Sequence, residues 1–165
     1  MMHPQFATIA KKIKEWRDQF VPDLKLALLS NGYRIHQPDI RKAMTFFDEP
    51  IIKLDCATPA KIVSVNQPIF SFHLEQFIED LKKCDRLIIQ TMFVKGYNDG
   101  ADDLQKWMEA LKKIQPSEVQ IYTVSRTPPN PISPISNREL QSIANVTSSL
   151  IGVPVRAYLT RSTGH

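Results

Sequence analysis

Residues 87–94 read Leu-Ile-Ile-Gln-Thr-Met-Phe-Val, a segment that is apolar except for Gln90 and Thr91. Successive side chains of a β-strand point to opposite faces, so a segment this apolar predicts a strand that is buried on both faces. Strands of this kind belong to parallel sheets that are covered by helices. The segment therefore indicates an α/β protein.

The same pattern extends along the chain in both directions from this strand. Further short apolar segments predict strands at residues 24–29, 51–55, 119–124 and 153–159. Apolar side chains at helical spacing predict helices over residues 6–20, 40–47, 74–81, 104–111 and 140–150. Strands that alternate with amphipathic helices favour a parallel sheet with right-handed crossovers. We therefore expect residues 1–165 to form a single α/β domain.

The first and last of these helices carry the clearest local signals. The apolar residues of the first helix lie on one stripe, and they are Phe6, Ile9, Ile13, Trp16 and Phe20. Three lysines lie off that stripe and are expected to form the solvated face: Lys11, Lys12 and Lys14. In the last helix, Ser136 and Glu139 have the spacing of a capping box, and Gly152 is expected to end the helix. A similar cap for the helix at 74–81 is expected from Ser71.

The composition is that of an ordinary globular protein, with 42% hydrophobic and 23% charged residues among 165. No apolar run approaches the roughly 20 residues that span a bilayer, and the start is not a secretory signal, so we expect a cytoplasmic protein without membrane contact. The net charge of +4 permits contact with nucleic acid but does not argue for it. The two cysteines, Cys56 and Cys84, form no CxxC or CxxxCxxC motif, which excludes closely spaced thiolate ligands within the chain.

Polar side chains occur where the predicted strands end. The carboxyl ends of parallel strands meet at one edge of the sheet, and ligands bind at that edge in such folds. The candidates for a binding site there are Asn31, Lys53, Asp55, Gln90, Thr123, Ser125 and Arg126. No phosphate-binding glycine loop, GxSxG or HExxH motif accompanies them.

Each candidate also has an ordinary structural explanation. Asn31 begins an Asn-Gly pair that is common in turns, and Arg126 fits a surface position. Lys53 and Asp55 share one strand face and explain each other as an ion pair. Gln90 is harder to explain, because burying an amide without a hydrogen-bonding partner costs about 1–3 kcal/mol. A polar barrel lumen or a ligand would supply that partner.

Four stretches of the chain, in this order, resemble the later strands of radical S-adenosylmethionine (SAM) enzymes. They are Leu28–Gly32, Ile52–Ala57 with Asn66–Pro68, Ile89–Asp99 and Val119–Pro129. The resemblance is to the Fe–S oxidoreductases grouped with the archaeal tRNA wyosine synthases, and it covers nearly the whole chain. It implies an incomplete (β/α) barrel of the TIM type, of which this chain would form strands three to six and a final strand.

The resemblance also implies the cofactors. Family members bind a [4Fe–4S] cluster through a CxxxCxxC loop and the methionine amino group of SAM through a Gly-Glu-Pro segment. This chain has neither motif and begins Met-Met-His-Pro, as though just after the second. We therefore expect a truncated radical SAM enzyme: the complete form would cleave SAM with its cluster, whereas this chain alone would be inactive and hold neither cofactor.

Site residues and partners follow from the same resemblance. Four residues would face SAM and the substrate: Asn31, Lys53, Asp55 and Gln90. Three would lie near the adenosine end of SAM: Thr123, Ser125 and Arg126. An N-terminal half supplied by a neighbouring gene is one expected partner, and tRNA is another.

Two other classes of protein fit parts of the sequence. A non-catalytic α/β module that binds a nucleotide or RNA fits the mild positive charge. A flavodoxin-like or receiver-type fold with five doubly wound strands fits the number of elements, with Asp55 as phosphoacceptor, but it lacks the acidic pair expected after the first strand. An incomplete barrel would leave the first and last strands with free edges, so we also expect self-association or poor solubility.

Overall fold

Five parallel strands form one sheet, and their order across the sheet, β1-β2-β3-β4-β5, is also their order along the chain. The structure is a computed structural model that describes residues 3–58, 61, 73–125 and 132–160. The strands are β1 (Ala27–Ser30), β2 (Glu49–Lys53), β3 (Ile88–Phe93), β4 (Glu118–Thr123) and β5 (Val155–Tyr158). The helices are α1 (Phe6–Phe20), α2 (Pro38–Met44), α4 (Leu74–Leu81), α5 (Ala101–Ile114) and α6 (Asn137–Ile151). The predicted alternation of helices and strands is confirmed.

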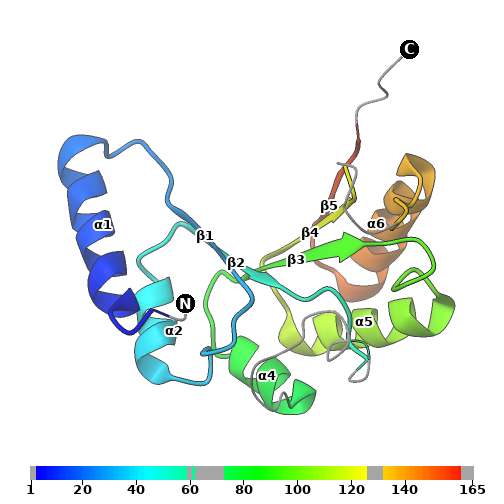
Figure 1. Ribbon diagram of the computed structural model, residues 1–165, viewed down its shortest axis with the longest axis horizontal. Helices are drawn as coiled ribbons and strands as arrows, with labels where there is room; N and C mark the ends of the chain where they lie inside the picture. Colours follow the sequence, from blue (N-terminus) through cyan, green and yellow to red (C-terminus); the bar gives the residue numbers. More distant parts are fainter. Residues whose placement is uncertain (1–2, 59–60, 62–72, 126–131, 161–165) are drawn as a thin grey trace.

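The sequential strand order identifies the class of α/β fold. A doubly wound sheet reverses its strand order at a switch point, so the flavodoxin-like interpretation is wrong. Figure 1 shows the sheet as an arc, with α2, α4, α5 and α6 along its outer side. The arc does not close, because β1 and β5 are the two ends of the sheet order. The predicted incomplete barrel is therefore confirmed.

The hydrophobic core lies between the sheet and the helices on its convex side. The side chains of Ile52, Ile89 and Val119 are fully buried and lie in one row across three strands. The helices contribute the fully buried leucines Leu81, Leu111 and Leu140. Burying such a side chain stabilises the fold by about 1.5–3 kcal/mol. The helices therefore cover the face of the sheet that carries Ile52, Ile89 and Val119.

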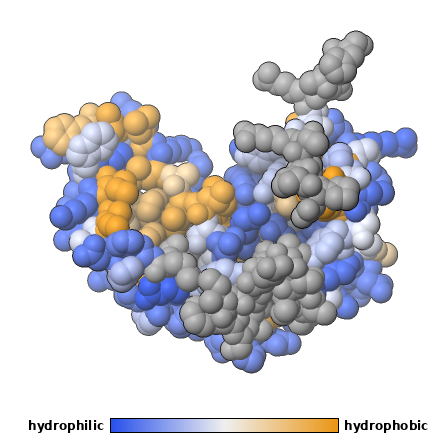
Figure 2. All heavy atoms as spheres, viewed as in Figure 1, coloured by the Kyte–Doolittle hydropathy of each residue, from blue (hydrophilic) through white to orange (hydrophobic). Residues whose placement is uncertain are grey.

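The opposite, concave face of the sheet is open, and Figure 2 shows it as a hollow between two raised ends of the molecule. Leu28 of β1 packs against the core, whereas its neighbour Leu29 is 58% exposed. In β5, Tyr158 is 46% exposed. Burial on both faces, which the apolar segments predicted, is therefore wrong for the edge strands. A closed barrel fills its lumen with these side chains, but this arc has no strands opposite them among the described residues.

Helix α1 presents most of its apolar stripe to solvent instead of to the core. Within α1, only Ala10 and Arg17 are buried. The exposed members of the predicted stripe are Ile9, Ile13, Trp16 and Phe20. The helix itself is confirmed, and Lys11 and Lys12 are exposed as predicted, whereas Lys14 is half-buried. The apolar stripe is thus a second face of α1, adjacent to the buried one.

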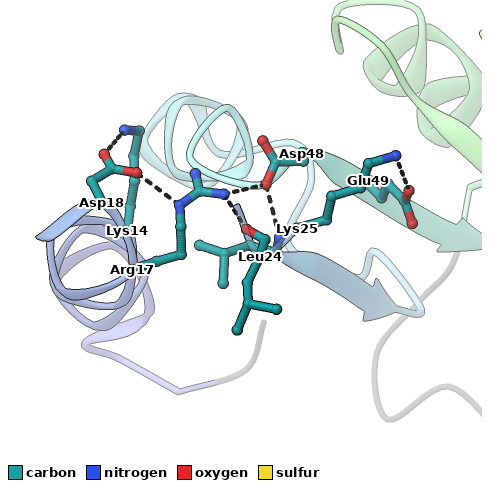
Figure 3. Close-up of polar contacts among 8 residues, drawn as sticks. Lys14, Arg17, Asp18, Leu24, Lys25, Asp48 and Glu49 are labelled. Atoms are coloured by element: carbon teal, nitrogen blue, oxygen red, sulfur yellow. Dashed lines mark hydrogen bonds and ion pairs between the residues drawn. The ribbon is translucent and has the colours of Figure 1, made fainter. Parts of the chain in front are cut away.

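A buried arginine sets the orientation of α1 (Figure 3). The guanidinium of Arg17 donates to the carbonyl oxygen of Leu24 at 2.6 Å and pairs with the Asp48 carboxylate at 2.7 Å. The same carboxylate oxygen accepts the backbone N–H of Leu26 at 2.8 Å. Asp18 pairs with Arg17 from within the helix, also at 2.7 Å. Because Leu26 precedes β1 and Asp48 precedes β2, these bonds attach α1 to the beginning of the sheet with Arg17 inward.

The ends of α6 form as the sequence predicts. The Ser136 hydroxyl accepts the Glu139 N–H at 3.2 Å, and the Glu139 carboxylate accepts the Ser136 N–H at 2.8 Å. Gly152 follows the helix with a φ of 71°, a conformation that is costly for a residue with a Cβ atom. For α4, the N-cap position is His73, and Ser71, which was predicted to cap it, lies outside the described residues.

Candidate functional site

The concave face carries a row of polar side chains across the middle of the sheet. The strand register places Lys53 beside Gln90, Gln90 beside Gln120, and Gln120 beside Arg156. Residues paired in register on neighbouring strands point to the same face. The row therefore crosses β2, β3, β4 and β5 on the face that the helices leave open.

Gln90 has the hydrogen-bonding partner that its position in an apolar strand requires. Its side-chain N–H donates to Oε1 of Gln120 at 3.3 Å, and the Gln120 amide donates to Glu118 at 3.0 Å. Glu118 also pairs with the Arg156 guanidinium at 3.3 Å. The amides are thus ordered by contacts within the sheet before any ligand is present.

Lys53 and Asp55 form the ion pair that their shared strand face predicts, with Nζ and Oδ2 3.2 Å apart. The other carboxylate oxygen of Asp55 accepts the Met92 N–H at 2.9 Å, which fixes Asp55 between β2 and β3. The Lys53 nitrogen lies 6.0 Å from the centre of the Tyr122 ring. Burial lowers the pKa of Lys53, but attraction to Asp55 and Tyr122 outweighs it and leaves the pKa raised. Lys53 is therefore a stable ammonium group that suits anion binding better than proton transfer.

An open groove of about 650 Å³ adjoins this row toward the carboxyl ends of β3, β4 and β5. It is lined by Gln90, Gln120, Tyr122, Thr123, Ser125, Tyr158, Leu159 and Thr160. The register places Met92, Tyr122 and Tyr158 in the next row along the strands. Amide and hydroxyl groups beside aromatic rings suit a ligand that combines a flat ring with polar substituents, such as a nucleoside.

The structure brings only some of the predicted site residues together. Those on the concave face or at the groove are Lys53, Asp55, Gln90 and Ser125. Asn31 is exposed just after β1, at the edge of the sheet and away from the groove. Arg126 lies outside the described residues. The contacts of all these residues with a ligand stay predictions.

Thr123 lines the groove, but its hydroxyl is already used inside the protein. The residue is 2% exposed, and its hydroxyl donates to the Phe93 carbonyl at 2.8 Å and accepts the Ile135 N–H at 3.0 Å. These bonds join the end of β4 to β3 and to the segment before α6. Thr123 therefore has a structural role in shaping the groove, whereas its predicted contact with adenosine stays a prediction.

Several residues of the groove were not among the sequence-based candidates, and they include Gln120, Tyr122 and Tyr158. A signal for the first two was available, since Gln120 and Tyr122 alternate with the apolar residues Val119 and Ile121. This period of two predicts a strand with one polar face. In an incomplete barrel that face is the lumen, which would have identified them.

Asn98 is a further residue near the site that was not among the sequence-based candidates. It is 3% exposed, and its amide donates to the carbonyl oxygens of Asp55 at 2.6 Å and Met92 at 2.8 Å. Its side-chain oxygen accepts the Val94 N–H at 2.8 Å. Asn98 thus joins the chain after β2 to the end of β3 and fixes the backbone at Asp55.

The described residues support neither a thiolate-bound metal site nor a membrane-crossing helix. Cys56 follows β2 and Cys84 precedes β3, so the two thiols lie at opposite ends of the parallel strands. Burial raises the pKa of each to about 11, which disfavours the thiolate that binds iron. No group of three His, Cys, Asp or Glu side chains there is placed to hold a metal. In the same residues, no helix combines the length and apolar character needed to cross a bilayer.

No protein-family model matches this chain. Curated proteins of similar sequence do match it, and they are longer than the chain. A UPF0026 protein of Synechocystis is 26% identical over an alignment of 159 residues, and the match covers 80% of this chain and 59% of that protein. A UPF0026 protein of Helicobacter pylori is 25% identical over 130 residues, covering 76% and 41%. The S-adenosyl-L-methionine-dependent tRNA 4-demethylwyosine synthase of Oryza sativa is 28% identical over 92 residues, covering 53% and 14%. The chain thus spans less than two thirds of each relative.

Three solved structures share the fold of this chain. A domain of pyruvate-formate lyase-activating enzyme from Bacteroides vulgatus has a TM-score of 0.67 at 8% identity, covering 96% of both chains. TYW1 with a lysine-pyruvate adduct bound has a TM-score of 0.64 at 16% identity, covering 90% of this chain and 46% of that one. A radical SAM methyltransferase from Sphaerobacter thermophilus has a TM-score of 0.63 at 15% identity, covering 81% and 40%. The resemblance predicted from the sequence is thereby confirmed: the chain has the fold of radical SAM structures, and part of it is similar in sequence to a tRNA 4-demethylwyosine synthase.

Proposed function

We propose that residues 1–165 act as one domain that holds SAM and part of the substrate in a radical SAM enzyme. The observation that carries this proposal is the ordered polar row of Lys53, Gln90 and Gln120 on the open face of the sheet. Bound SAM supplies the radical chemistry of this class together with an iron–sulfur cluster. The residues of this chain bind the ligand and orient it.

The groups on the concave face match the chemical parts of SAM. Tyr122 and Tyr158 offer ring faces for the adenine, and Ser125 offers a hydroxyl at the same end of the groove. The amides of Gln90 and Gln120 suit the ribose hydroxyls. The Lys53 ammonium suits the carboxylate of the methionine part.

The cluster does not fit this chain. It needs three thiolates close together, whereas the chain has two cysteines in all, and these lie at opposite ends of the strands. We therefore place the cluster in polypeptide outside these residues, such as an N-terminal half encoded by a neighbouring gene. By this proposal the chain is the truncated, carboxyl-terminal part of the enzyme and does not cleave SAM by itself.

The substrate class proposed for the assembled enzyme is tRNA. It is supported by the similarity to the Oryza sativa synthase, whose name states that it acts on tRNA. Binding to tRNA would be measured by fluorescence anisotropy at two salt concentrations, because release of counterions makes such binding fall steeply with salt. Equal binding at both concentrations would contradict a backbone-directed tRNA contact.

The chain alone is not expected to retain SAM, but the groups that it contributes to the site should still contact SAM at high concentration. Titration of the isotopically labelled chain with SAM, followed by NMR, therefore tests the proposed ligand site. We expect the side-chain amide signals of Gln90 and Gln120 and the backbone signal of Ser125 to shift, while the indole signal of Trp16 on α1 stays in place. Gln90→Leu removes one hydrogen bond of about 1–1.5 kcal/mol and should weaken binding about tenfold. Gln141→Leu, an exposed change on α6, serves as the control.

Two outcomes of this titration would count against the proposal. Shifts confined to residues away from the concave face would place the ligand elsewhere. Equal affinity for SAM and for adenosine monophosphate would instead favour the alternative of a non-catalytic nucleotide-binding module.

A further inference from the structure

An uncovered apolar surface lies over α1 and β1, and Figure 2 shows it at one end of the molecule. We call it the α1 surface. It is formed by Ile9, Ile13, Trp16, Phe20, Leu24 and Leu29, which are 41–59% exposed. The rings of Trp16 and Phe20 pack together, with centroids 5.6 Å apart. A contiguous apolar patch of this kind marks a site of protein contact.

The orientation of α1 makes this surface a built feature and not the result of a loosely placed helix. Arg17 points inward and is held by Asp48 and the Leu24 carbonyl (Figure 3). On the same side of the helix, Phe6 stacks on Phe47 with ring centroids 6.3 Å apart. With its inner face held in this way, α1 must present Trp16 and its apolar neighbours outward.

The position of α1 relative to the sheet indicates what covers the surface. Each later helix connects two strands that are neighbours in the sheet. Helix α1 precedes β1, and the edge of β1 that faces away from β2 has no strand beside it among the described residues. In sheets of this type a helix packs across both strands of its crossover. The described residues therefore contain no strand on the outer side of β1, and the half of α1 that would pack on such a strand is uncovered.

We propose that the α1 surface and the free edge of β1 together bind a helix–strand unit of another polypeptide segment. Its strand would pair in parallel with β1, and its amphipathic helix would cover Ile13 and Trp16. The length of the relatives supports this occupant, since 41% of the Synechocystis protein lies outside the match, which covers 59% of it. The proposal rests on the proposed function only for the role of that segment, which would also carry the cluster.

The probe for this proposal is the part of the Synechocystis relative that the match does not cover, joined ahead of the chain by a flexible linker. A short linker gives millimolar effective concentration, so weak docking is also detected. Trp107 is 1% exposed and Trp16 is 57% exposed, so quenching by acrylamide reports on Trp16. We expect Trp16 to lose its access to acrylamide, and the β1 amides to exchange hydrogen at least about tenfold more slowly.

Matched variants locate the contact. Ile13→Lys places a charge in the centre of the α1 surface and should restore both quenching and exchange to the values of the unfused chain. Leu150→Lys makes the same change at a 61% exposed position of α6, beside the other edge of the sheet, and should have no effect. Neither residue lines the groove or touches the polar row.

Three results would overturn the proposal: no protection of Trp16 and β1 in the fusion, equal effects of the two lysine variants, or a dimer of the unfused chain that Ile13→Lys dissociates. The last result, read by light scattering, would assign the α1 surface to a second copy of the chain. Titrating the fusion with SAM separates this proposal from the proposed function. Docking without SAM binding would overturn only the function, and SAM binding without docking only the present proposal.

Discussion

A single hydroxyl, that of Thr91, joins three elements at the centre of the core. It donates to the Leu54 carbonyl at 2.8 Å and accepts the indole N–H of Trp107 at 3.0 Å, and the residue has no exposed surface. The indole ring in turn packs edge-on against Phe93, with centroids 5.1 Å apart. Without Thr91, a buried donor and a buried acceptor would both lack partners.

Thr91→Val keeps the shape of this side chain but removes the hydroxyl, so we expect a loss of about 2 kcal/mol in the free energy of unfolding. Urea denaturation followed by tryptophan fluorescence would measure it. Thr91→Ser keeps the hydroxyl and loses one methyl group, for an expected loss of about 1 kcal/mol. If the serine variant were the less stable of the two, the hydrogen bonds would not be the cause.

The Asp48 carboxylate gives the protein one source of acid sensitivity. The Leu26 N–H, followed by Arg17, holds the pKa of Asp48 below its usual value. A lowered pKa stabilises the fold above the unfolded-state pKa of about 3.9, and this contribution is lost as the pH falls through the folded-state value. Asp48→Asn should therefore lower the free energy of unfolding at pH 7 by about 1 kcal/mol or less, because the carboxylate is partly exposed. The difference from wild type should shrink as the pH falls below about 3.9, and thermal unfolding between pH 7 and pH 2 tests this.

At the scale of the element, α6 and α1 differ in the contacts that fix them: those of α6 join residues close in the sequence, whereas those of α1 join residues far apart. The capping box of α6 joins residues only three apart, and Gly152 ends the helix by its own conformational freedom. Both features could be predicted from the sequence for that reason. The orientation of α1 depends on Arg17 and Asp48, which are 31 positions apart in the chain. A helical period identifies an apolar stripe, but it does not reveal that a tertiary ion pair turns the stripe outward.

Ser136→Ala tests the local part of this account. The change removes the acceptor for the Glu139 N–H and should lower the free energy of unfolding by about 1 kcal/mol. Ser149→Ala, at an exposed position inside the same helix, should be neutral or slightly stabilising because alanine favours helices. Chemical denaturation measured by circular dichroism compares the two, and equal losses would show that the cap contributes nothing.

At the scale of the whole molecule, the open form of the sheet explains why some residues of the candidate site could be predicted from the sequence and others could not. Lys53, Asp55 and Gln90 stood out because they interrupt apolar strands, and their polar contacts with one another and with Gln120 account for them. Tyr158 did not stand out, because one polar face on an edge strand resembles ordinary exposure to water. The position of Asn31 outside the groove depends on how far the arc extends, which local patterns do not encode.

The same openness predicts an order of local stability across the sheet. Strand β3 has neighbours on both sides and a buried hydrogen bond to α5, from the Trp107 indole to Thr91, whereas β1 and β5 each have one neighbour. Hydrogen exchange measured by mass spectrometry should therefore be slowest in β3 and at least about tenfold faster in β1 and β5. Uniform exchange across all strands would mean that the sheet opens only by global unfolding.

The match between strand order in space and strand order in the chain has a consequence for how such proteins change in evolution. Each βα step adds to the one before it without threading past any other, so a gene can gain or lose whole steps at either end while the remaining ones keep their contacts. The catalytic repertoire of a family built this way can therefore be divided between separately encoded pieces, and rejoined, without redesign of the sheet that they share.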